Sequence, residues 1–235
     1  MSDYILQTKG LTKKFKNQIV VDNTSLSIRK NSVFGLLGPN GAGKSTMLKM
    51  IIGIMTPNSG EILFENRPWS RADLKDIGAL IESPAVYPNL TAMENLKVAC
   101  TLYGLSDTRA EEVLNIIDLE NVGKKKVKNF SMGMKQRLGI GIAIINKPKL
   151  LILDEPTNGL DPIGIEELRK LIRSFPPQGM TVILSSHILS EVAQVADEIG
   201  IISNGIIGHT GKINKKDDLE KIFMDIVRRN RGTRQ

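Results

Sequence analysis

One segment of the sequence combines the residue types and the spacing that hold a polyphosphate. Residues 38–46 read GPNGAGKST; they follow the apolar stretch 33–37 and open a stretch with helical periodicity. Glycines let backbone N–H groups point inward at phosphate oxygens, and the N-terminal end of the following helix adds positive potential. Lys44 can reach β- and γ-phosphates, and the Ser45 hydroxyl can ligate Mg²⁺. The pattern predicts a site for a nucleoside triphosphate and Mg²⁺, formed by Gly38, Pro39, Asn40, Gly41, Ala42, Gly43, Lys44, Ser45 and Thr46.

A pair of carboxylates follows a second apolar stretch. Residues 150–155 read LLILDE, so Asp154 and Glu155 stand at the carboxyl end of a predicted strand. Ligands of parallel sheets collect at this end, where the phosphate loop also lies, so Asp154 is predicted to reach the Mg²⁺ held by Ser45. Glu155 is predicted to point elsewhere and to act as general base on the attacking water. Many strands end in a solvated acid, so Asp154 and Glu155 indicate a nucleotide site only in combination with the phosphate loop.

Two further segments offer groups that can contact phosphate. Ser131, Met132, Gly133 and Met134 open a predicted helix with Ser131 as N-cap, and such a helix end is a second candidate phosphate-binding site. Because the chain has one phosphate loop, a distant second site indicates completion by another subunit. His187 ends an apolar strand and is a candidate for contact with the γ-phosphate. An ordinary helix cap and a hydrogen-bonded strand-end histidine remain the plainer interpretations.

Strands and helices alternate around these motifs. Apolar stretches predict strands, and the stretches of helical spacing between them predict helices. This order favours an α/β fold with a parallel core sheet covered on both faces. The predicted strands are residues 4–6, 19–28, 33–37, 150–153 and 181–184, and the predicted helices are residues 45–54, 166–174 and 190–196.

The middle of the chain departs from this alternation. Residues 91–103, 109–117 and 132–145 have helical spacing, and no strong strand separates them. Residues 84–145 are therefore predicted to form a helical lobe inserted into the sheet domain.

The last part of the chain begins with a hairpin signal. Asn204-Gly205 lies between two apolar stretches and predicts a two-residue turn. A charged helical segment at 215–227 follows. We therefore expect one domain over residues 1–212 and a separate C-terminal segment over 213–235. The basic tail of this segment carries Arg228, Arg229, Arg231 and Arg234.

The composition is that of a globular protein with a basic surface. The 235 residues are 41% hydrophobic and 24% charged, with a formal net charge of +7. Nucleic acid and an anionic membrane are candidate neighbours, although a solvated basic surface accounts for most of this charge. The single cysteine, Cys100, cannot form an internal disulfide and indicates a reducing compartment. No apolar stretch is long enough to span a bilayer, so work at a membrane would require a partner's spanning helices.

Together these motifs resemble those of ATP-binding cassette (ABC) transporter ATPases. The phosphate loop, the Ser-x-Gly segment, LLILDEPT at 150–157, NGLD at 158–161 and Ser-Ser-His at 185–187 occur in that family's order and spacing. The resemblance covers roughly residues 4–212. It implies a P-loop NTPase fold with a parallel core sheet, an N-terminal antiparallel β subdomain and an inserted helical lobe. It also implies Mg-dependent hydrolysis of ATP.

The resemblance implies how the sites are completed. Two ATP molecules would lie between two subunits in a head-to-tail dimer, with the phosphate loop of one chain facing Ser131–Gly133 of the other. Asp161 would lie across the dimer interface. Phe15 matches the aromatic residue that stacks on adenine, where Tyr is more usual; a core aromatic is the plainer interpretation.

The resemblance also implies partners and a location. The helical lobe would receive a short helix from integral membrane permease subunits, which handle the cargo. The chain would then be a peripheral protein on the cytoplasmic face of the membrane, soluble when isolated, and no nucleic acid is expected. A soluble ABC ATPase acting on nucleic acid or ribosomes is the alternative that the basic pI of about 9.4 favours. Such proteins usually carry two cassettes or a long coiled-coil insertion, and the sequence has neither.

Two positions depart from the family pattern. The signature Leu-Ser-Gly-Gly-Gln reads FSMGM at 130–134, which keeps Ser131 and Gly133. Glu82 stands where the family places a glutamine that touches Mg²⁺, and a carboxylate there could bind Mg²⁺ more tightly than an amide or be repelled by the γ-phosphate. Glu82 is expected at the metal and in coupling to the membrane partner rather than as the base. The surrounding IESP at 81–84 resembles self-immunity ATPases of lantibiotic producers, whose exporters expel a membrane-active peptide. Bacitracin-type and other drug exporters remain the alternative.

Overall fold

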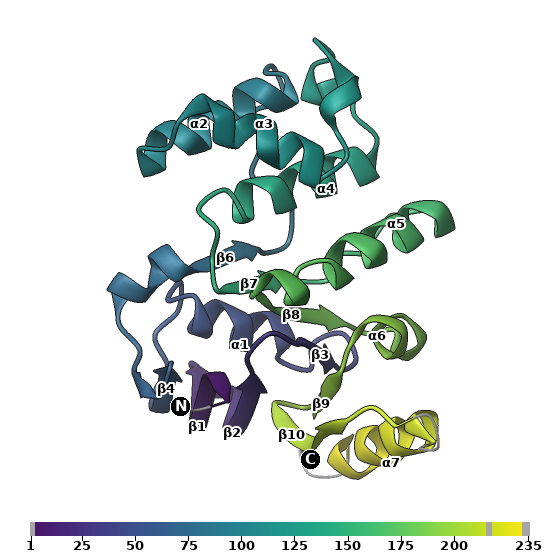
Figure 1. The fold of residues 1–235 in the computed structure, drawn as a ribbon. Helices are drawn as coiled ribbons and strands as arrows, with labels where there is room; N and C mark the ends of the chain where they lie inside the picture. The colour runs from purple at the N-terminus through teal and green to yellow at the C-terminus, as the bar shows by residue number, and fades with distance from the viewer. Residues whose placement is uncertain (1–2, 215–217, 232–235) are drawn as a thin grey trace.

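Two β-sheets form the centre of the molecule, and the computed structural model describes residues 3–214 and 218–231 (Figure 1). The larger sheet has the strand order β10-β9-β3-β8-β7-β6, and all its pairs are parallel except β9–β10. The smaller sheet is antiparallel, with the order β2-β1-β4-β5. The predicted α/β fold with a parallel core sheet and an N-terminal antiparallel subdomain is confirmed. The strands are β1 (Tyr4–Phe15), β2 (Gln18–Arg29), β3 (Val33–Leu37), β4 (Ser59–Phe64), β5 (Arg67–Pro68), β6 (Ile77–Leu80), β7 (Leu150–Leu153), β8 (Thr181–Ser186), β9 (Glu198–Ser203) and β10 (Ile206–Lys212).

The larger sheet is buried on both faces because its strands send alternate side chains into two apolar clusters. Phe34 and Leu36 of β3 lie in the cluster shared with the smaller sheet, whereas Val33 and Leu37 lie in the cluster shared with the helical lobe. Every residue of β3 is buried. Burial on both faces explains why this strand reads as a continuous apolar run rather than as an alternating one.

Helix α1 (Lys44–Ile51) packs in the cluster that joins the two sheets (Figure 1). Its Met47, Leu48, Met50 and Ile51 side chains are buried there, and this stripe follows helical spacing. Because interiors are close-packed, this contact fixes the N-terminus of α1 at the carboxyl end of β3.

Helices α2, α3 and α4 gather in one helical lobe, and α4 packs against β6 of the larger sheet (Figure 1). A reciprocal cap fixes the start of α2: Thr91 Oγ1 accepts from the backbone N–H of Glu94, and Glu94 Oε2 accepts from that of Thr91 at 2.6 Å. This backbone hydrogen bond and the nearby Lys126 ammonium lower the pKa of Glu94 to about 2. Gly104, in the left-handed region, ends α2. The helices of the lobe are α2 (Ala92–Tyr103), α3 (Asp107–Ile116) and α4 (Met132–Ala143).

Helices α5 and α6 pack with the parallel sheet, and α7 packs on the β9–β10 hairpin (Figure 1). The predicted turn is present, with Asn204 at φ 50° and Gly205 at φ 78°. The Asn230 amide of α7 donates to the Ser203 carbonyl at 3.2 Å, and Ile226 is buried against the hairpin. The division of the chain at residue 212 stays a prediction, and Arg234 and the start of the helix predicted at 215 lie outside the described residues. The bounds are α5 (Pro162–Arg173), α6 (Leu189–Val195) and α7 (Leu219–Arg231).

Several elements were not predicted from the sequence. Strands β4, β5 and β6 are short, and β4 and β6 contain a glycine each, so their apolar signal is weak. Strand β1 continues to Phe15 rather than ending at Leu6, because pairing with β2 and β4 on both sides holds its polar second half. Short 3-10 turns occur at Arg71–Asp76, Glu120–Val122, Val127–Asn129 and Pro176–Gln178.

Strand β6 lies so close to the end of α4 that only glycine fits at position 78. A Cβ atom added to Gly78 would lie 2.0 Å from the Ala143 carbonyl oxygen. We expect Gly78→Ala to lower the free energy of unfolding by about 1–3 kcal/mol through overpacking, as measured by urea denaturation. Ala79→Ser, at the exposed neighbour in the same strand, is the control. Equal stability of the two variants would contradict this close approach.

Candidate functional site

The phosphate loop forms a tight turn between β3 and α1. Gly43 is the N-cap of α1 with a φ of 105°, and a Cβ atom there would lie 2.7 Å from the Val20 carbonyl oxygen. A Cβ atom at Gly38 would lie 2.2 Å from the Ile202 carbonyl oxygen. Such a turn directs successive backbone N–H groups to one side, where an anion can bind. The pocket there is lined by Val20, Asn40, Gly41, Ala42, Gly43, Lys44, Ser45, Thr46 and Glu155.

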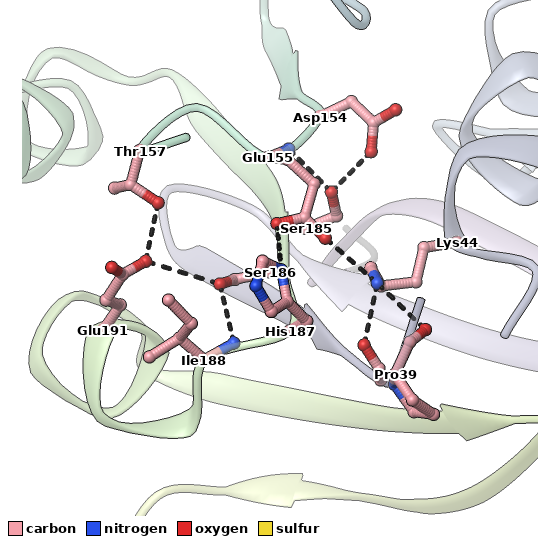
Figure 2. A network of polar contacts seen from close by, with 11 residues as sticks. Pro39, Lys44, Asp154, Glu155, Thr157, Ser185, Ser186, His187, Ile188 and Glu191 are labelled. Atoms are coloured by element: carbon pink, nitrogen blue, oxygen red, sulfur yellow. Dashed lines mark hydrogen bonds and ion pairs between the residues drawn. The ribbon is translucent and has the colours of Figure 1, made fainter. Parts of the chain in front are cut away.

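Lys44 is a buried cation with three oxygen partners (Figure 2). Its Nζ donates to the Gly38 carbonyl at 2.7 Å and to the Pro39 carbonyl at 3.2 Å, and it lies 3.0 Å from Glu155 Oε1. The side chain is only 5% exposed, so these partners offset the cost of removing its charge from water. The amine therefore points into the loop, where phosphate oxygens can take the place of these partners.

Ser185 of β8 joins the two carboxylates that follow β7 (Figure 2). Its hydroxyl donates to Asp154 Oδ1 at 2.5 Å and accepts from the backbone N–H of Glu155 at 2.9 Å. Ser185 is completely buried, and Asp154 is nearly so. Because β7 and β8 are adjacent parallel strands, the sheet itself fixes this contact.

Glu155 combines an unfavourable backbone conformation with two side-chain contacts (Figure 2). Its φ is 49°, in the left-handed region that costs a residue with a side chain about 1–3 kcal/mol. Oε1 faces Lys44, and Oε2 lies 2.9 Å from Nδ1 of His187. The structure therefore brings Lys44, Asp154, Glu155 and His187 together, with Glu155 pointing away from Asp154 as predicted.

A second carboxylate network lies beside His187 (Figure 2). Glu191 Oε2 accepts from Thr157 Oγ1 at 2.6 Å and from Ser186 Oγ at 3.4 Å, and Ser186 Oγ in turn accepts from the backbone N–H of Ile188. These bonds tie the segment after Glu155 to the segment around His187.

The predicted signature residues line a different pocket from the phosphate loop, and the two pockets share no lining residue. Ser131 is the N-cap of α4, as predicted, and its Oγ accepts from the Met134 backbone N–H at 3.2 Å. Asp161 caps α5 by accepting from the Gly164 backbone N–H at 2.8 Å. The signature pocket is lined by Asp118, Leu119, Val122, Ser131, Met132, Gly133, Met134, Arg137, Gly159, Leu160, Asp161, Ile163, Gly164 and Glu167.

Phe15 lies at the tip of the β1–β2 hairpin, opposite Gln18. Its side chain is 42% exposed, and Lys13 Nζ lies 5.3 Å from the ring centroid. The plainer interpretation of Phe15 as a core aromatic is therefore wrong. Val20, on β2, lines the phosphate pocket, so the hairpin that carries Phe15 at its tip reaches this site through its second strand.

Glu82 follows β6 and forms an ion pair with Lys49 of α1. The hydrogen bond and charge of the Lys49 ammonium lower the pKa of Glu82 below its usual value. The Glu82 side chain is 68% exposed, and its φ is 64°, again in the left-handed region.

The oxygen donors near the loop fit an Mg²⁺ ion that is shared with phosphate. The Ser45 hydroxyl and the Asp154 carboxylate are hard donors of the kind that Mg²⁺ prefers. Within residues 3–214 and 218–231, no group of three or more His, Cys, Asp or Glu side chains can hold a metal ion. Mg²⁺ needs no such group when phosphate oxygens and water complete its coordination.

Two contributors to this site were missed by reasoning from the sequence. The motif Ser-Ser-His contained Ser185, but nothing in it indicated a bond to Asp154. Lys49 stands four residues after Ser45, a spacing that predicts the same helix face, yet its partner Glu82 comes from a distant segment.

Comparisons with known proteins agree with this geometry. The sequence model of the family described as "ABC transporter" matches residues 21–158. Lantibiotic transport ATP-binding protein SrtF of Streptococcus pyogenes is 50% identical over 93% of this chain and 96% of its own length. Bacitracin transport ATP-binding protein BcrA of Bacillus licheniformis is 44% identical over 97% of this chain and 72% of its own. A solved structure of an ATP-binding subunit of an ABC transporter has a TM-score of 0.82 at 30% identity, over 94% of this chain and 99% of that one.

The Ser185 hydroxyl bridges the Asp154 carboxylate and the Glu155 backbone N–H. Removing this hydroxyl therefore tests the bonded arrangement. We expect Ser185→Ala to lower the free energy of unfolding by about 1–3 kcal/mol, because a buried carboxylate oxygen and a backbone N–H lose their partner. Urea denaturation measures this loss. Ser190→Ala, at an exposed position on α6, is the matched control. A Ser185→Ala protein as stable as this control would contradict the bonded arrangement.

Proposed function

Because this chain belongs to the ABC transporter family as an ATP-binding subunit, we propose that it hydrolyses Mg-ATP to power export of a lantibiotic peptide through membrane permease subunits. The observation that carries the catalytic part is the chain of contacts from Lys44 through Glu155 to His187 at the phosphate loop. These contacts join a phosphate-binding cation, a candidate base and an imidazole, and the first two line the phosphate pocket.

Each residue of the pocket has a separate task in this proposal. When bound, Mg²⁺ supplies neutralisation of phosphate charge, and Ser45 and Asp154 are the residues that would hold it. Lys44 exchanges its contacts with carbonyl and carboxylate oxygens for β- and γ-phosphate oxygens. Glu155, released from Lys44, accepts the proton of the attacking water.

His187 connects the base to the phosphate. One ring nitrogen lies on Glu155 Oε2, which leaves the other ring nitrogen for the γ-phosphate. Phe15 would stack on the adenine from the hairpin tip.

A second copy of the chain would complete each site. The signature pocket and the phosphate pocket share no lining residue, which supports contact of a nucleotide held by Lys44 with Ser131–Met134 of another chain. Met132 and Ile163 beside Ser131 are more than half exposed, as expected of residues that become covered in a dimer. Asp161 lies on the same surface and would contact the second copy.

The membrane part of the proposal rests on the relatives. SrtF is named a lantibiotic transport protein, and half of its aligned residues are identical to those of this chain. None of the helices in residues 3–214 and 218–231 combines the length and apolar character needed to cross a bilayer. In this proposal, integral permease subunits hold the chain at the cytoplasmic face and handle the membrane peptide. Bacitracin export is the second candidate, favoured by the similarity to BcrA.

Removing the charge of Glu155 tests the catalytic assignment. We expect Glu155→Gln to bind Mg-ATP, to lower the rate of ATP hydrolysis by about 10²- to 10⁴-fold, and to accumulate as an ATP-bound dimer. Phosphate release measures turnover, and size-exclusion chromatography with ATP measures dimer formation. Glu111→Gln, at an exposed position on α3, should leave both unchanged.

Two outcomes would contradict these assignments. Turnover of Glu155→Gln equal to that of the Glu111→Gln control would remove Glu155 as the base. ATP binding that survives Lys44→Ala undiminished would remove the phosphate loop as the nucleotide site.

The cargo can be tested by resistance. Expression of this chain with its membrane subunits in a sensitive bacterium should raise the minimal inhibitory concentration of a lantibiotic and leave that of bacitracin unchanged. The Glu155→Gln variant should abolish the rise. Protection against bacitracin alone would reject lantibiotic export and support the second candidate.

A further inference from the structure

The ion pair between Lys49 and Glu82 links the phosphate-loop helix to the segment that leads into the helical lobe. Its two members are unequal: the Lys49 side chain is 21% exposed, whereas that of Glu82 is 68% exposed. The Lys49 side chain therefore packs against the protein, whereas most of the Glu82 side chain faces solvent.

The pair lies close to both proposed metal ligands. Ser45 and Lys49 are four residues apart on α1 and so lie on the same helix face, about one turn or roughly 6 Å apart along the axis. Both are half-buried, between the buried stripe of α1 and solvent. From the other side, the Asp154 backbone N–H donates to the Leu80 carbonyl at 2.9 Å, only two residues before Glu82.

The segment that carries Glu82 also packs on α4, the helix that begins after Ser131. A Cβ atom added to Gly139 of α4 would lie 2.8 Å from Pro84 Cβ and 3.1 Å from Leu80 Cδ1. A displacement of residues 80–84 would therefore displace α4, because closely packed surfaces transmit displacement. Glu82 thus stands between α1 and the lobe.

We propose that Lys49 is a positioning residue that competes with the metal site for the Glu82 carboxylate. The inference rests on the proposed function, since it requires Mg-nucleotide at the loop. In the pair, Lys49 holds Glu82 one turn from Ser45. An Mg²⁺ ion held by Ser45 and Asp154 would offer the Glu82 carboxylate a second cation. The Lys49 ammonium would then compete with Mg²⁺ for that carboxylate.

This competition can be measured from the binding of Mg²⁺ alone. Calorimetry would titrate Mg²⁺ into protein saturated with a non-hydrolysable ATP analogue, for the unaltered chain, Lys49→Met, Glu82→Gln and the double variant. We expect Lys49→Met to tighten Mg²⁺ binding by about two- to fivefold, the range that an exposed ion pair is worth. In the Glu82→Gln background, the same lysine change should have no comparable effect.

Matched controls keep the test decisive. Lys49→Gln is a second variant that should behave as Lys49→Met does, and Lys49→Arg, which keeps the charge, should stay near the unaltered chain. Lys30→Met breaks another surface ion pair, with Glu65, and should not change Mg²⁺ binding. Thermal unfolding of each variant confirms that it is folded.

Three results separate the possible failures. Equal tightening by Lys49→Met in the unaltered chain and in the Glu82→Gln background would show that Lys49 acts by its charge through space, which overturns the inference. No change on removing Lys49 would also overturn it. Failure of the unaltered chain to bind the nucleotide analogue would reject the proposed function, and the inference with it.

Discussion

The functional end of this molecule depends on a buried lysine. Lys44 has almost no contact with solvent, and an ammonium group in such a place is stable only with oxygen partners around it. Two of these partners are carbonyls of its own loop, and the third is the Glu155 carboxylate from a strand far along the chain. The requirement to satisfy this one charge joins the anion-binding turn to the acidic strand end. The Glu155 carboxylate thereby balances the charge of the Lys44 ammonium.

Sheet order explains how the remaining groups reach the same place. Strands β3, β8, β7 and β6 are neighbours and run parallel, so their carboxyl ends form one edge. The phosphate loop follows β3, His187 follows β8, Asp154 and Glu155 follow β7, and Glu82 follows β6. Crossover segments separate these strands in sequence and leave their ends together in space. Every side chain assigned to the nucleotide within one chain, apart from Phe15 on the other sheet, thus comes from this edge or from α1.

The sequence predicted those parts of the site that are encoded locally. The bounds of β3 were predicted correctly because a strand buried on both faces is continuously apolar. The α4 cap was predicted because serine is a preferred residue at the N-cap of a helix. The contacts of Ser185 with Asp154 and of Lys49 with Glu82 join residues from different elements, and no local pattern specifies them. Strand β6 was missed because four residues with a central glycine carry little periodicity, although pairing with β7 makes them a strand.

The two helix caps of the signature pocket differ in what they can still bind. A hydroxyl has one donor and two acceptor sites, so Ser131 can accept from the Met134 backbone and still donate to a phosphate oxygen. An ionised carboxylate only accepts, so Asp161, already bonded to the Gly164 backbone, has nothing to donate to an anion. Its other oxygen can only accept a hydrogen bond, which excludes a direct bond to a phosphate oxygen and agrees with the proposed contact of Asp161 with a second copy. Hydrogen-bond chemistry therefore distinguishes the roles proposed for Ser131 and Asp161, although both residues cap a helix beside the same pocket.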